Sequence, residues 1–212
     1  MADDPQIRSV KISEDERRGW SSERPRREGE AARPPDVSVR CRVLRPTDHV
    51  RYSPGSMLVI VSPSAADRDR FAAEMVPNKA ALLSLAKVRA LLEGRVPDED
   101  VADRAAEVLD AAILKRLQSS ETVVVAADGM EPAERERYVR LAARARRPRH
   151  LLLLEPARGD VADEDRAALN ELRRRLDAGE LGAEGFQTAV RIGGAARGEL
   201  KRILFAHPPR ED

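Results

Sequence analysis

The segment from Leu58 to Ala72 has the residue order of a phosphate-binding site. It reads LVIVSPSAADRDRFA, an apolar run followed by a Ser-Pro-Ser turn and a helical stretch. A strand, a tight loop and a helix in this order hold a phosphate when backbone N–H groups of the loop and the first helical turn point at the anion. The candidate phosphate-binding side chains are therefore Ser62, Ser64 and Arg68.

The same segment lacks the residues that this chemistry usually needs. It has no glycine to give the loop a permissive backbone and no lysine to reach the phosphate. Asp67 and Asp69 instead bring two carboxylates to the start of the helix, and each would repel a phosphate by on the order of a few kcal/mol. Ser64 and Asp67 have the spacing of a capping box, in which the acid reaches back to the serine. We therefore expect the protein's own carboxylates to fill the site.

Two further sets of residues could carry chemistry elsewhere in the chain. Asp128 and Gly129 follow an apolar run, at the carboxyl edge where doubly wound sheets carry functional loops, although a simple turn is the favoured interpretation. The histidines, His49, His150 and His207, are far apart, and none has a histidine or cysteine at metal-ligand spacing. We expect no metal site.

A strongly basic segment, ERERYVRLAARARRPRH, begins at Glu134. The arginines that could contact nucleic-acid phosphates are Arg137, Arg140, Arg144, Arg146, Arg147 and Arg149. Tyr138 could stack on a base. A solvated helix face explains the same pattern, because acids in the first turn and arginines near the C-terminus suit the helix dipole. The solvated face is the favoured interpretation, and nucleic-acid binding remains an alternative.

Apolar runs and helical periodicity alternate along the chain. The apolar runs cover residues 57–61, 122–127, 150–155 and, more weakly, 186–192. The helical patterns cover residues 65–75, 85–92, 98–118, 132–146 and 163–176. Continuous apolar runs separated by amphipathic helices are typical of a parallel sheet that is buried on both faces. The sequence therefore predicts an α/β fold in three layers, with a mainly parallel sheet.

The two ends of the chain differ from this central pattern. Residues 1–36 are rich in mixed charge, Pro, Gly and Ser, so we expect a disordered tail in which Trp20 either anchors a partner or packs on the domain. A single domain is expected over 37–212, and its first part, 37–56, contains the alternating run VSVRCRVL, which predicts an edge strand or a hairpin. The segment 193–212 includes an amphipathic stretch expected to pack on the sheet, with a partner-binding helix as the alternative.

Composition limits the classes of partner and compartment. The chain has 38 Lys+Arg and 37 Asp+Glu, a net charge of +1, so no bulk field attracts nucleic acid or an anionic membrane. Its one cysteine, Cys41, excludes an internal disulfide. The start, MADDPQIR, lacks the apolar core of a secretory signal, and the apolar runs are too short to cross a bilayer. These features predict a cytoplasmic protein without a membrane segment.

The order of these pieces resembles the small P-loop kinases related to bacterial polynucleotide kinases and zeta-toxin-like phosphotransferases. In that family an apolar strand leads into a glycine-rich loop that ends in Gly-Lys-Ser/Thr, followed by a helix that begins near a phenylalanine. In the register of this chain, Ser62 stands at the first glycine, Asp67 at the second glycine, Arg68 at the lysine and Asp69 at the Mg²⁺-binding hydroxyl. Phe71 follows as in the family.

Later landmarks of the same family also occur in order, and they are altered as well. The segment Ser84–Arg89 resembles the Ser-x-Asp-x-x-Arg motif whose acid serves the acceptor hydroxyl, with Ala86 in the acid's place. Ala126 replaces the acid that ends the next family strand. The segment 155–165 leads almost directly to the next helix, which implies that the arginine-bearing lid is largely deleted. The resemblance covers roughly residues 57–192.

The resemblance implies a P-loop NTPase fold that has lost its catalytic residues. The expected function is therefore that of a pseudoenzyme, a binding, scaffold or regulatory module with a protein partner and no cofactor. One alternative is a nucleotide-binding or active ATP-dependent kinase of small molecules or polynucleotides, with Mg²⁺ and with Ser62, Ser64 and Arg68 as its atypical loop. A nucleic-acid-binding module that uses the arginines of residues 137–149 is the other.

Overall fold

The computed structural model describes residues 41–43, 50–127, 130–156 and 161–207. By its internal contacts the chain divides into residues 1–36 and 37–212, and all described residues belong to the second unit. The predictions for the N-terminal tail and Trp20, for His49, and for Asp128 and Gly129 lie outside the described residues.

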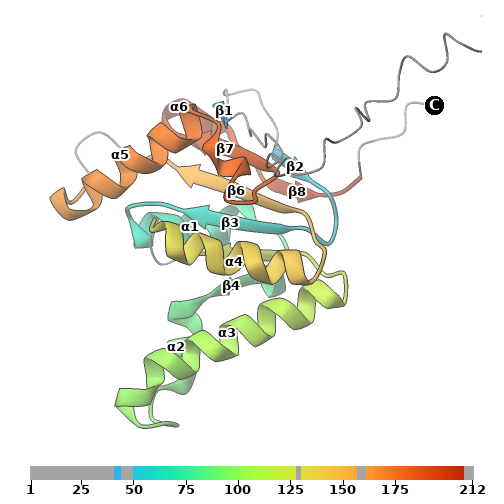
Figure 1. The fold of residues 1–212 in the computed structure, drawn as a ribbon, viewed down its shortest axis with the longest axis vertical. Helices are drawn as coiled ribbons and strands as arrows, with labels where there is room; N and C mark the ends of the chain where they lie inside the picture. The colour runs from blue at the N-terminus through green and yellow to red at the C-terminus, as the bar shows by residue number, and fades with distance from the viewer. Residues whose placement is uncertain (1–40, 44–49, 128–129, 157–160, 208–212) are drawn as a thin grey trace, which may run out of the picture. The chain divides into compact units, whose positions relative to one another are not determined.

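Eight strands and six α-helices make up the described part of the unit (Figure 1). The strands are β1 (Cys41–Val43), β2 (Val50–Tyr52), β3 (Met57–Val61), β4 (Leu82–Ser84), β5 (Val123–Ala126), β6 (Arg149–Leu154), β7 (Thr188–Ile192) and β8 (Ile203–Phe205). The α-helices are α1 (Ala65–Met75), α2 (Leu85–Leu92), α3 (Val101–Gln118), α4 (Pro132–Arg144), α5 (Asp163–Asp177) and α6 (Gly194–Glu199). Short 3₁₀ turns are η2 (Lys79–Ala81), η3 (Asp98–Asp100) and η4 (Glu180–Gly182). None of these helices has the length and apolarity needed to cross a bilayer.

Six strands form one sheet in the order β1-β7-β6-β3-β5-β4, and every pairing in it is parallel. From the central strand β3 the chain moves first to β4 and β5 on one side and then to β6 and β7 on the other. This change of direction makes the carboxyl end of β3 a topological switch point, the place where open parallel sheets bind ligands. The predicted α/β architecture is confirmed, and it is consistent with a P-loop NTPase-like fold.

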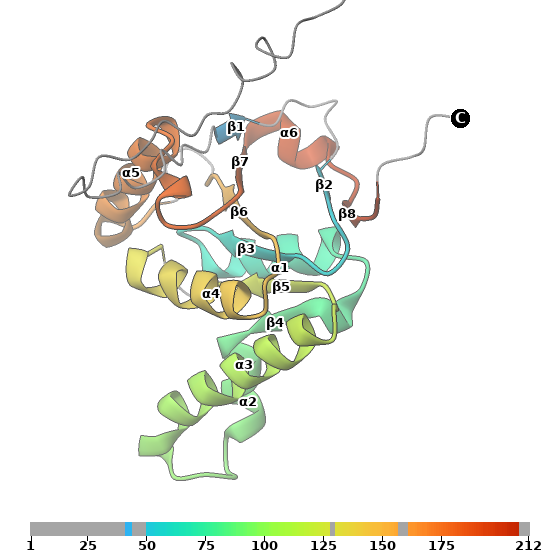
Figure 2. The same cartoon turned by 45° about the vertical axis from the view of Figure 1, so that its right-hand side comes forward.

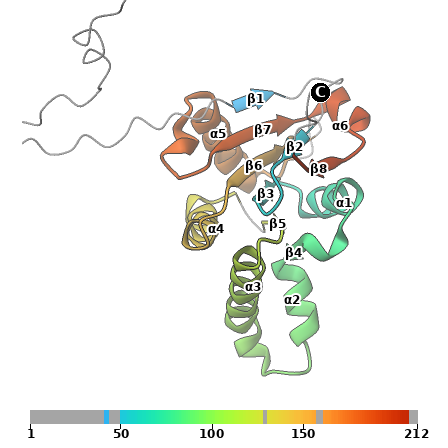
Figure 3. The same cartoon turned by 90° about the vertical axis from the view of Figure 1, so that its right-hand side faces the viewer.

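Apolar side chains on both faces of the sheet explain the three layers. In β3, Met57, Val59 and Val61 face one core and Leu58 and Ile60 face the other, because successive side chains in a strand alternate. Helices α3, α4 and α5 contribute to the first core. Helix α1 and the strands β2 and β8 contribute to the second. Figure 3 shows α3 and α4 on one side of the sheet and α1 on the other.

At the two ends of this unit, the structure contradicts one of the alternative predictions made from the sequence for each end. Strand β1 lies at the edge of the large sheet beside β7, whereas β2 pairs with β8 in a separate two-stranded sheet (Figure 2). The hairpin alternative for residues 37–56 is therefore wrong. In the C-terminal segment, residues Ile203–Phe205 of the amphipathic stretch form strand β8 beside β2 and are not a helix. Ile203 is fully buried in the second core.

Candidate functional site

The loop at residues 62–64 joins the end of β3 to the start of α1, at the carboxyl edge of the sheet. Ser64 is the N-cap of α1, and its Oγ accepts a hydrogen bond of 3.2 Å from the backbone N–H of Asp67. The Oγ of buried Ser62 accepts from the backbone N–H of Ser64 at 3.3 Å. Two backbone donors that could bind a phosphate are therefore bonded to the loop's own serines.

The backbone of the loop also differs from that of an anion-binding loop. Ser64 has φ −102° and ψ 107°, an extended conformation, and none of residues 62–64 has a positive φ. Anion-binding nests alternate right-handed and left-handed residues, so that consecutive N–H groups converge on one point. Without a left-handed residue, these N–H groups do not converge in that way.

The side chain of Arg68 is buried at the carboxyl edge of the sheet. The residue is only 1% exposed, although it lies in the first turns of α1. Its Nη1 donates to the carbonyl oxygen of Ala127, directly after β5, and its Nε donates to Oδ1 of Asp69 at 2.9 Å. The guanidinium thus links α1 to the carboxyl end of β5, the strand next to β3. The position that resembles the phosphate-binding lysine is used in an internal contact.

The two carboxylates at the start of α1 are paired with arginines. Asp69 pairs with Arg68, and Asp67 pairs with Arg70 and with Arg197 of α6, the latter at 3.2 Å. The hydrogen bond from Arg197 is the main reason that the pKa of Asp67 lies below its usual value. Both carboxylates thus lie at the start of α1, each bound by an arginine. Asp67 does not complete a capping box, because the backbone N–H of Ser64 donates to Ser62.

The residues at this position do not fit a Mg²⁺ site. Asp69 stands where the resemblance expects a hydroxyl, and its carboxylate is engaged by Arg68. Ala126, which ends β5, offers no acid. Across the described residues, no group of three or more histidine, cysteine or acidic side chains could hold a metal ion.

The position that corresponds to the acceptor acid carries no carboxylate either. Ser84 caps α2 by accepting the backbone N–H of Lys87 at 3.3 Å. Ala86, in the first turn of this helix, is exposed. This segment therefore keeps the helix-capping role of its serine without an acid that could activate a hydroxyl.

Comparison with known proteins gives the site no assignment. No family model matches the chain, and no curated protein matches it. The resemblance to P-loop kinases thus has only the order of the motifs and the fold in its support.

Three arginines of the basic segment form hydrogen bonds with other groups of the protein. Arg137 binds Asp110 of α3, with 2.8 Å between Nε and Oδ1. Arg147 donates to the carbonyl oxygen of Leu117 at 2.9 Å, and Arg149 donates to a backbone carbonyl before β7. The exposed arginines of the segment are Arg140, Arg144 and Arg146. The arginines therefore do not form one free basic surface.

His150 is buried in the second core. It is 7% exposed, its Nδ1 lies 2.8 Å from Oγ1 of Thr188, and its ring stacks on Tyr52 with 4.5 Å between centroids. Burial lowers the pKa of His150 to about 4, so the ring is neutral near pH 7. Its ring packs between Tyr52 and Thr188 near the start of β6. His207 is exposed near the end of the described residues.

One buried ion pair and one partly buried carboxylate with two arginines have no counterpart among the predicted residues. Arg135 is 1% exposed, and its Nε and Nη2 each lie 3.0 Å from a carboxylate oxygen of Glu184. Glu155, directly after β6, accepts hydrogen bonds from Arg173 and Arg191. No sequence signal reveals these pairs, because the partners are 18 to 49 residues apart. The segment 155–165, where the arginine-bearing lid was expected to be largely deleted, includes residues 157–160, which lie outside the described ranges.

Proposed function

We propose that the protein is a catalytically inactive, P-loop-kinase-like pseudoenzyme that acts as a binding, scaffold or regulatory module for a protein partner. The proposal combines a parallel sheet whose topology suits ligand binding at the end of β3 with a loop in which phosphate-binding groups are replaced. It assigns no transferred group and no cofactor to the chain.

The buried guanidinium of Arg68 is the observation that carries the proposal. A γ-phosphate at the carboxyl end of β3 would have to displace a charged side chain that is 1% exposed and bonded to Ala127 and Asp69. Removing one partner from a buried charged hydrogen bond costs about 1.5–3 kcal/mol or more. Ser62 and Ser64 add to this cost, since one N–H of the loop and one of the first turn of α1 would have to leave their serine acceptors.

A calorimetric titration with ATP tests the proposal directly. The natural protein would be titrated with and without Mg²⁺, beside a variant that restores the loop residues, Asp67→Gly, Arg68→Lys and Asp69→Ser. We expect the natural protein to bind ATP more weakly than about 1 mM, equivalent to about −4 kcal/mol, and Mg²⁺ to make no difference.

Two controls make a negative titration meaningful. Circular dichroism and a urea unfolding curve would show that the titrated protein is folded. Arg70→Lys would provide a matched change on the same helix at a side chain that is 63% exposed, and it should leave the result unchanged. Binding of ATP by the natural protein with micromolar affinity would overturn the proposal and favour the kinase alternative, which an oligonucleotide or small-molecule phosphorylation assay would then examine.

A further inference from the structure

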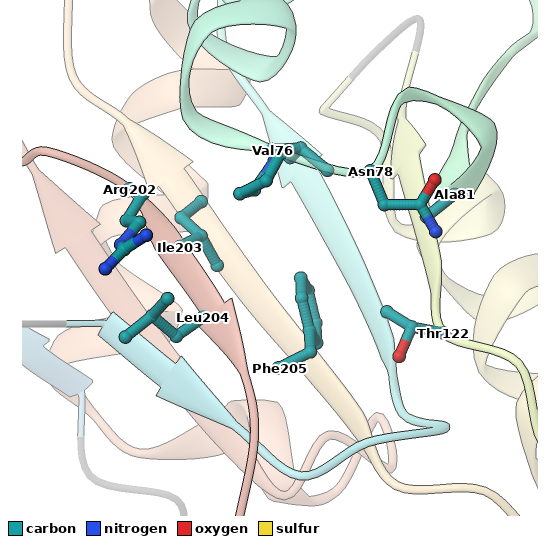
Figure 4. A pocket seen from close by; sticks show the side chains of 9 residues that line it. Val76, Asn78, Ala81, Thr122, Arg202, Ile203, Leu204 and Phe205 are labelled. Carbon is teal, nitrogen blue, oxygen red and sulfur yellow. The ribbon is translucent and has the colours of Figure 1, made fainter.

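A cavity of about 400 Å³ lies between the end of α1 and strand β8 (Figure 4). Its lining residues are Val76, Pro77, Asn78, Ala81, Thr122, Arg202, Ile203, Leu204 and Phe205. This volume is within the range of about 300–1,000 Å³ that is typical of small-molecule sites. It is about the volume that 13 water molecules occupy in the liquid, at about 30 Å³ each.

The cavity is separate from the loop at the carboxyl edge. Val76 follows the C-terminus of α1, while Ala81 and Thr122 directly precede β4 and β5. Since α1 leads from the carboxyl edge back to the start of β4, these residues lie at the amino edge of the sheet. The cavity is therefore independent of the site discussed above.

The middle of the cavity is apolar. Val76 and Ile203 form its floor as part of the second core. Pro77, Leu204 and Phe205 are the apolar lining residues that keep exposed surface. The ring of Phe205 is half-buried, and in Figure 4 it lies between Leu204 and Thr122. Aromatic pairs gain about 0.5–1.5 kcal/mol beyond their buried area. An aromatic body would therefore suit this part of the cavity better than a polar one.

One end of the cavity is positively charged. Arg202 is exposed there, and it forms no ion pair with any described residue. A second hollow of about 200 Å³ beside it is lined by Arg51, Lys201, Arg202 and Leu204. Three cations next to an apolar cavity favour a ligand with a carboxylate at this end, because Arg binds carboxylates with two parallel hydrogen bonds.

The other end offers hydrogen-bond donors. Oδ1 of Asn78 accepts the backbone N–H of Ala80 at 3.0 Å, which leaves the amide NH₂ to donate elsewhere. Oγ1 of Thr122 accepts the backbone N–H of Gly55 at 3.0 Å, which leaves its hydroxyl proton to donate. In Figure 4 Asn78 and Thr122 lie on the side away from Arg202. A ligand would complement this end with an oxygen acceptor.

We propose that this cavity binds a small aromatic carboxylic acid that carries an oxygen acceptor at the end opposite its carboxylate. Arg202 binds the carboxylate, Phe205 and the aliphatic lining contact the ring system, and Asn78 and Thr122 donate to the distal oxygen. The site requires no nucleotide and no metal.

Three naphthalene compounds, titrated calorimetrically into the full-length protein, test the contacts proposed for the carboxylate, the ring system and the distal oxygen. They are 6-hydroxy-2-naphthoate, 2-naphthoate, which lacks the distal oxygen, and 2-naphthol, which lacks the carboxylate. We expect 6-hydroxy-2-naphthoate to bind most tightly. Loss of the carboxylate should weaken binding at least about tenfold, and loss of the hydroxyl about threefold to tenfold, as charged and neutral hydrogen bonds respectively predict.

Two variants and a matched control locate the binding. Arg202→Gln should weaken both acids about tenfold or more and leave 2-naphthol unchanged, and Leu204→Trp should fill the cavity and remove binding of all three. Arg144→Gln, at an exposed arginine of α4, should change nothing. No binding of 6-hydroxy-2-naphthoate, equal affinity for acid and naphthol, or acid binding that survives Arg202→Gln would each overturn the proposal.

Discussion

At the scale of the residue, Arg68 shows why an arginine in place of a lysine changes the loop. The guanidinium is a planar fork whose donors point in several directions, whereas the lysine ammonium is a compact charge on a flexible stem. In this chain one nitrogen reaches the carbonyl of Ala127 while another reaches Asp69. The adjacent acid neutralises the charge, so that the arginine is stable in a buried position without an external anion.

The buried contacts of Arg68 predict a large effect on stability. Arg68→Ala leaves the carbonyl of Ala127 without this donor and opens a void, so we expect the free energy of unfolding to fall by about 2–3 kcal/mol. Arg70→Ala breaks only an exposed pair with Asp67 and should cost less than about 1 kcal/mol. Urea unfolding curves of both variants measure the difference. Equal losses at the two positions would contradict a structural role for Arg68.

The burial of His150 predicts that stability falls with acid. The pKa of His150 is lowered to about 4 in the folded protein, against about 6.5 in the unfolded chain. Below pH 6.5 the imidazole of residue 150 binds a proton in the unfolded chain but not in the folded protein. The contribution of His150 to the free energy of unfolding is therefore present above pH 6.5 and is lost as the pH falls towards 4. The expected loss between pH 6.5 and 5 is roughly 2 kcal/mol, measured by urea unfolding at each pH.

Two histidine variants separate this effect from other titrations. His150→Gln should remove the dependence on pH between 6.5 and 5, because no group at position 150 then takes a proton. His207→Gln changes an exposed histidine and should retain the dependence. If His150→Gln keeps the slope of the natural protein, another group is responsible.

At the scale of the element, a buried ion pair fixes α4 against the segment that enters β7. Arg135 binds both carboxylate oxygens of Glu184 and also donates to the carbonyl of Met130. Glu184 is in addition paired with Arg175 of α5 at 2.8 Å. One carboxylate thus joins α4 and α5, the two helices on this face of the sheet that follow β5 and β6.

Breaking this pair should cost far more than breaking an exposed pair on the same helix. Glu184→Ala leaves Arg135 buried without its carboxylate, for which we expect a loss of about 3–5 kcal/mol in the free energy of unfolding. Glu136→Ala removes an exposed partner of Arg140, with an expected change below about 1 kcal/mol. The midpoints of urea unfolding curves of the Glu184→Ala and Glu136→Ala variants measure the difference. A loss at Glu184 as small as that at Glu136 would show that the pair contributes little.

The elements that the sequence predicted are those with strong local signals. The apolar runs predicted β3, β5 and β6 to within a residue or two, and the helical periodicities predicted the five longer helices. Helix α3 begins three residues after its predicted start, because the 3₁₀ turn η3 occupies those residues. Strands β2, β4 and β8 have only three residues each, which is too short for a period of two to be recognised. Their pairing depends on tertiary contacts.

The strand, loop and helix around residues 62–64 were predicted from the sequence, and their side-chain contacts only in part. The serine cap of α1 follows from local spacing, and the bond from Asp67 N–H to Ser64 confirms it. The burial of Arg68 was not predictable, since its acceptor on Ala127 lies 59 residues away. The pairing of Asp67 with Arg197, 130 residues away, was hidden for the same reason.

At the scale of the whole unit, the two edges of the sheet carry different kinds of surface chemistry. The parallel strands bring all their carboxyl ends to one edge, where Arg68 is bonded within the chain and Glu155 is bound by two arginines. The amino edge carries the cavity beside β8, with Arg202 unpaired among the described residues. Ligand binding is therefore expected at the amino edge.

The charge distribution predicts weak binding of nucleic acid. The net charge is only +1, and Arg137, Arg147 and Arg149 bind groups within the protein. We expect a fluorescent single-stranded oligonucleotide to show no change in anisotropy at an ionic strength of about 0.15 M. Binding at this ionic strength that weakens steeply with added salt, and that is lost in Arg144→Gln/Arg146→Gln, would contradict this expectation.

The most direct measurement for the central claim is a crystal structure of the natural protein soaked with ATP and Mg²⁺. We predict that the guanidinium of Arg68 still donates to the carbonyl of Ala127 and to Asp69, with no triphosphate at residues 62–68. Density for a triphosphate in this loop, with the Arg68 side chain moved away from Ala127, would contradict the claim that the protein has closed its own phosphate site.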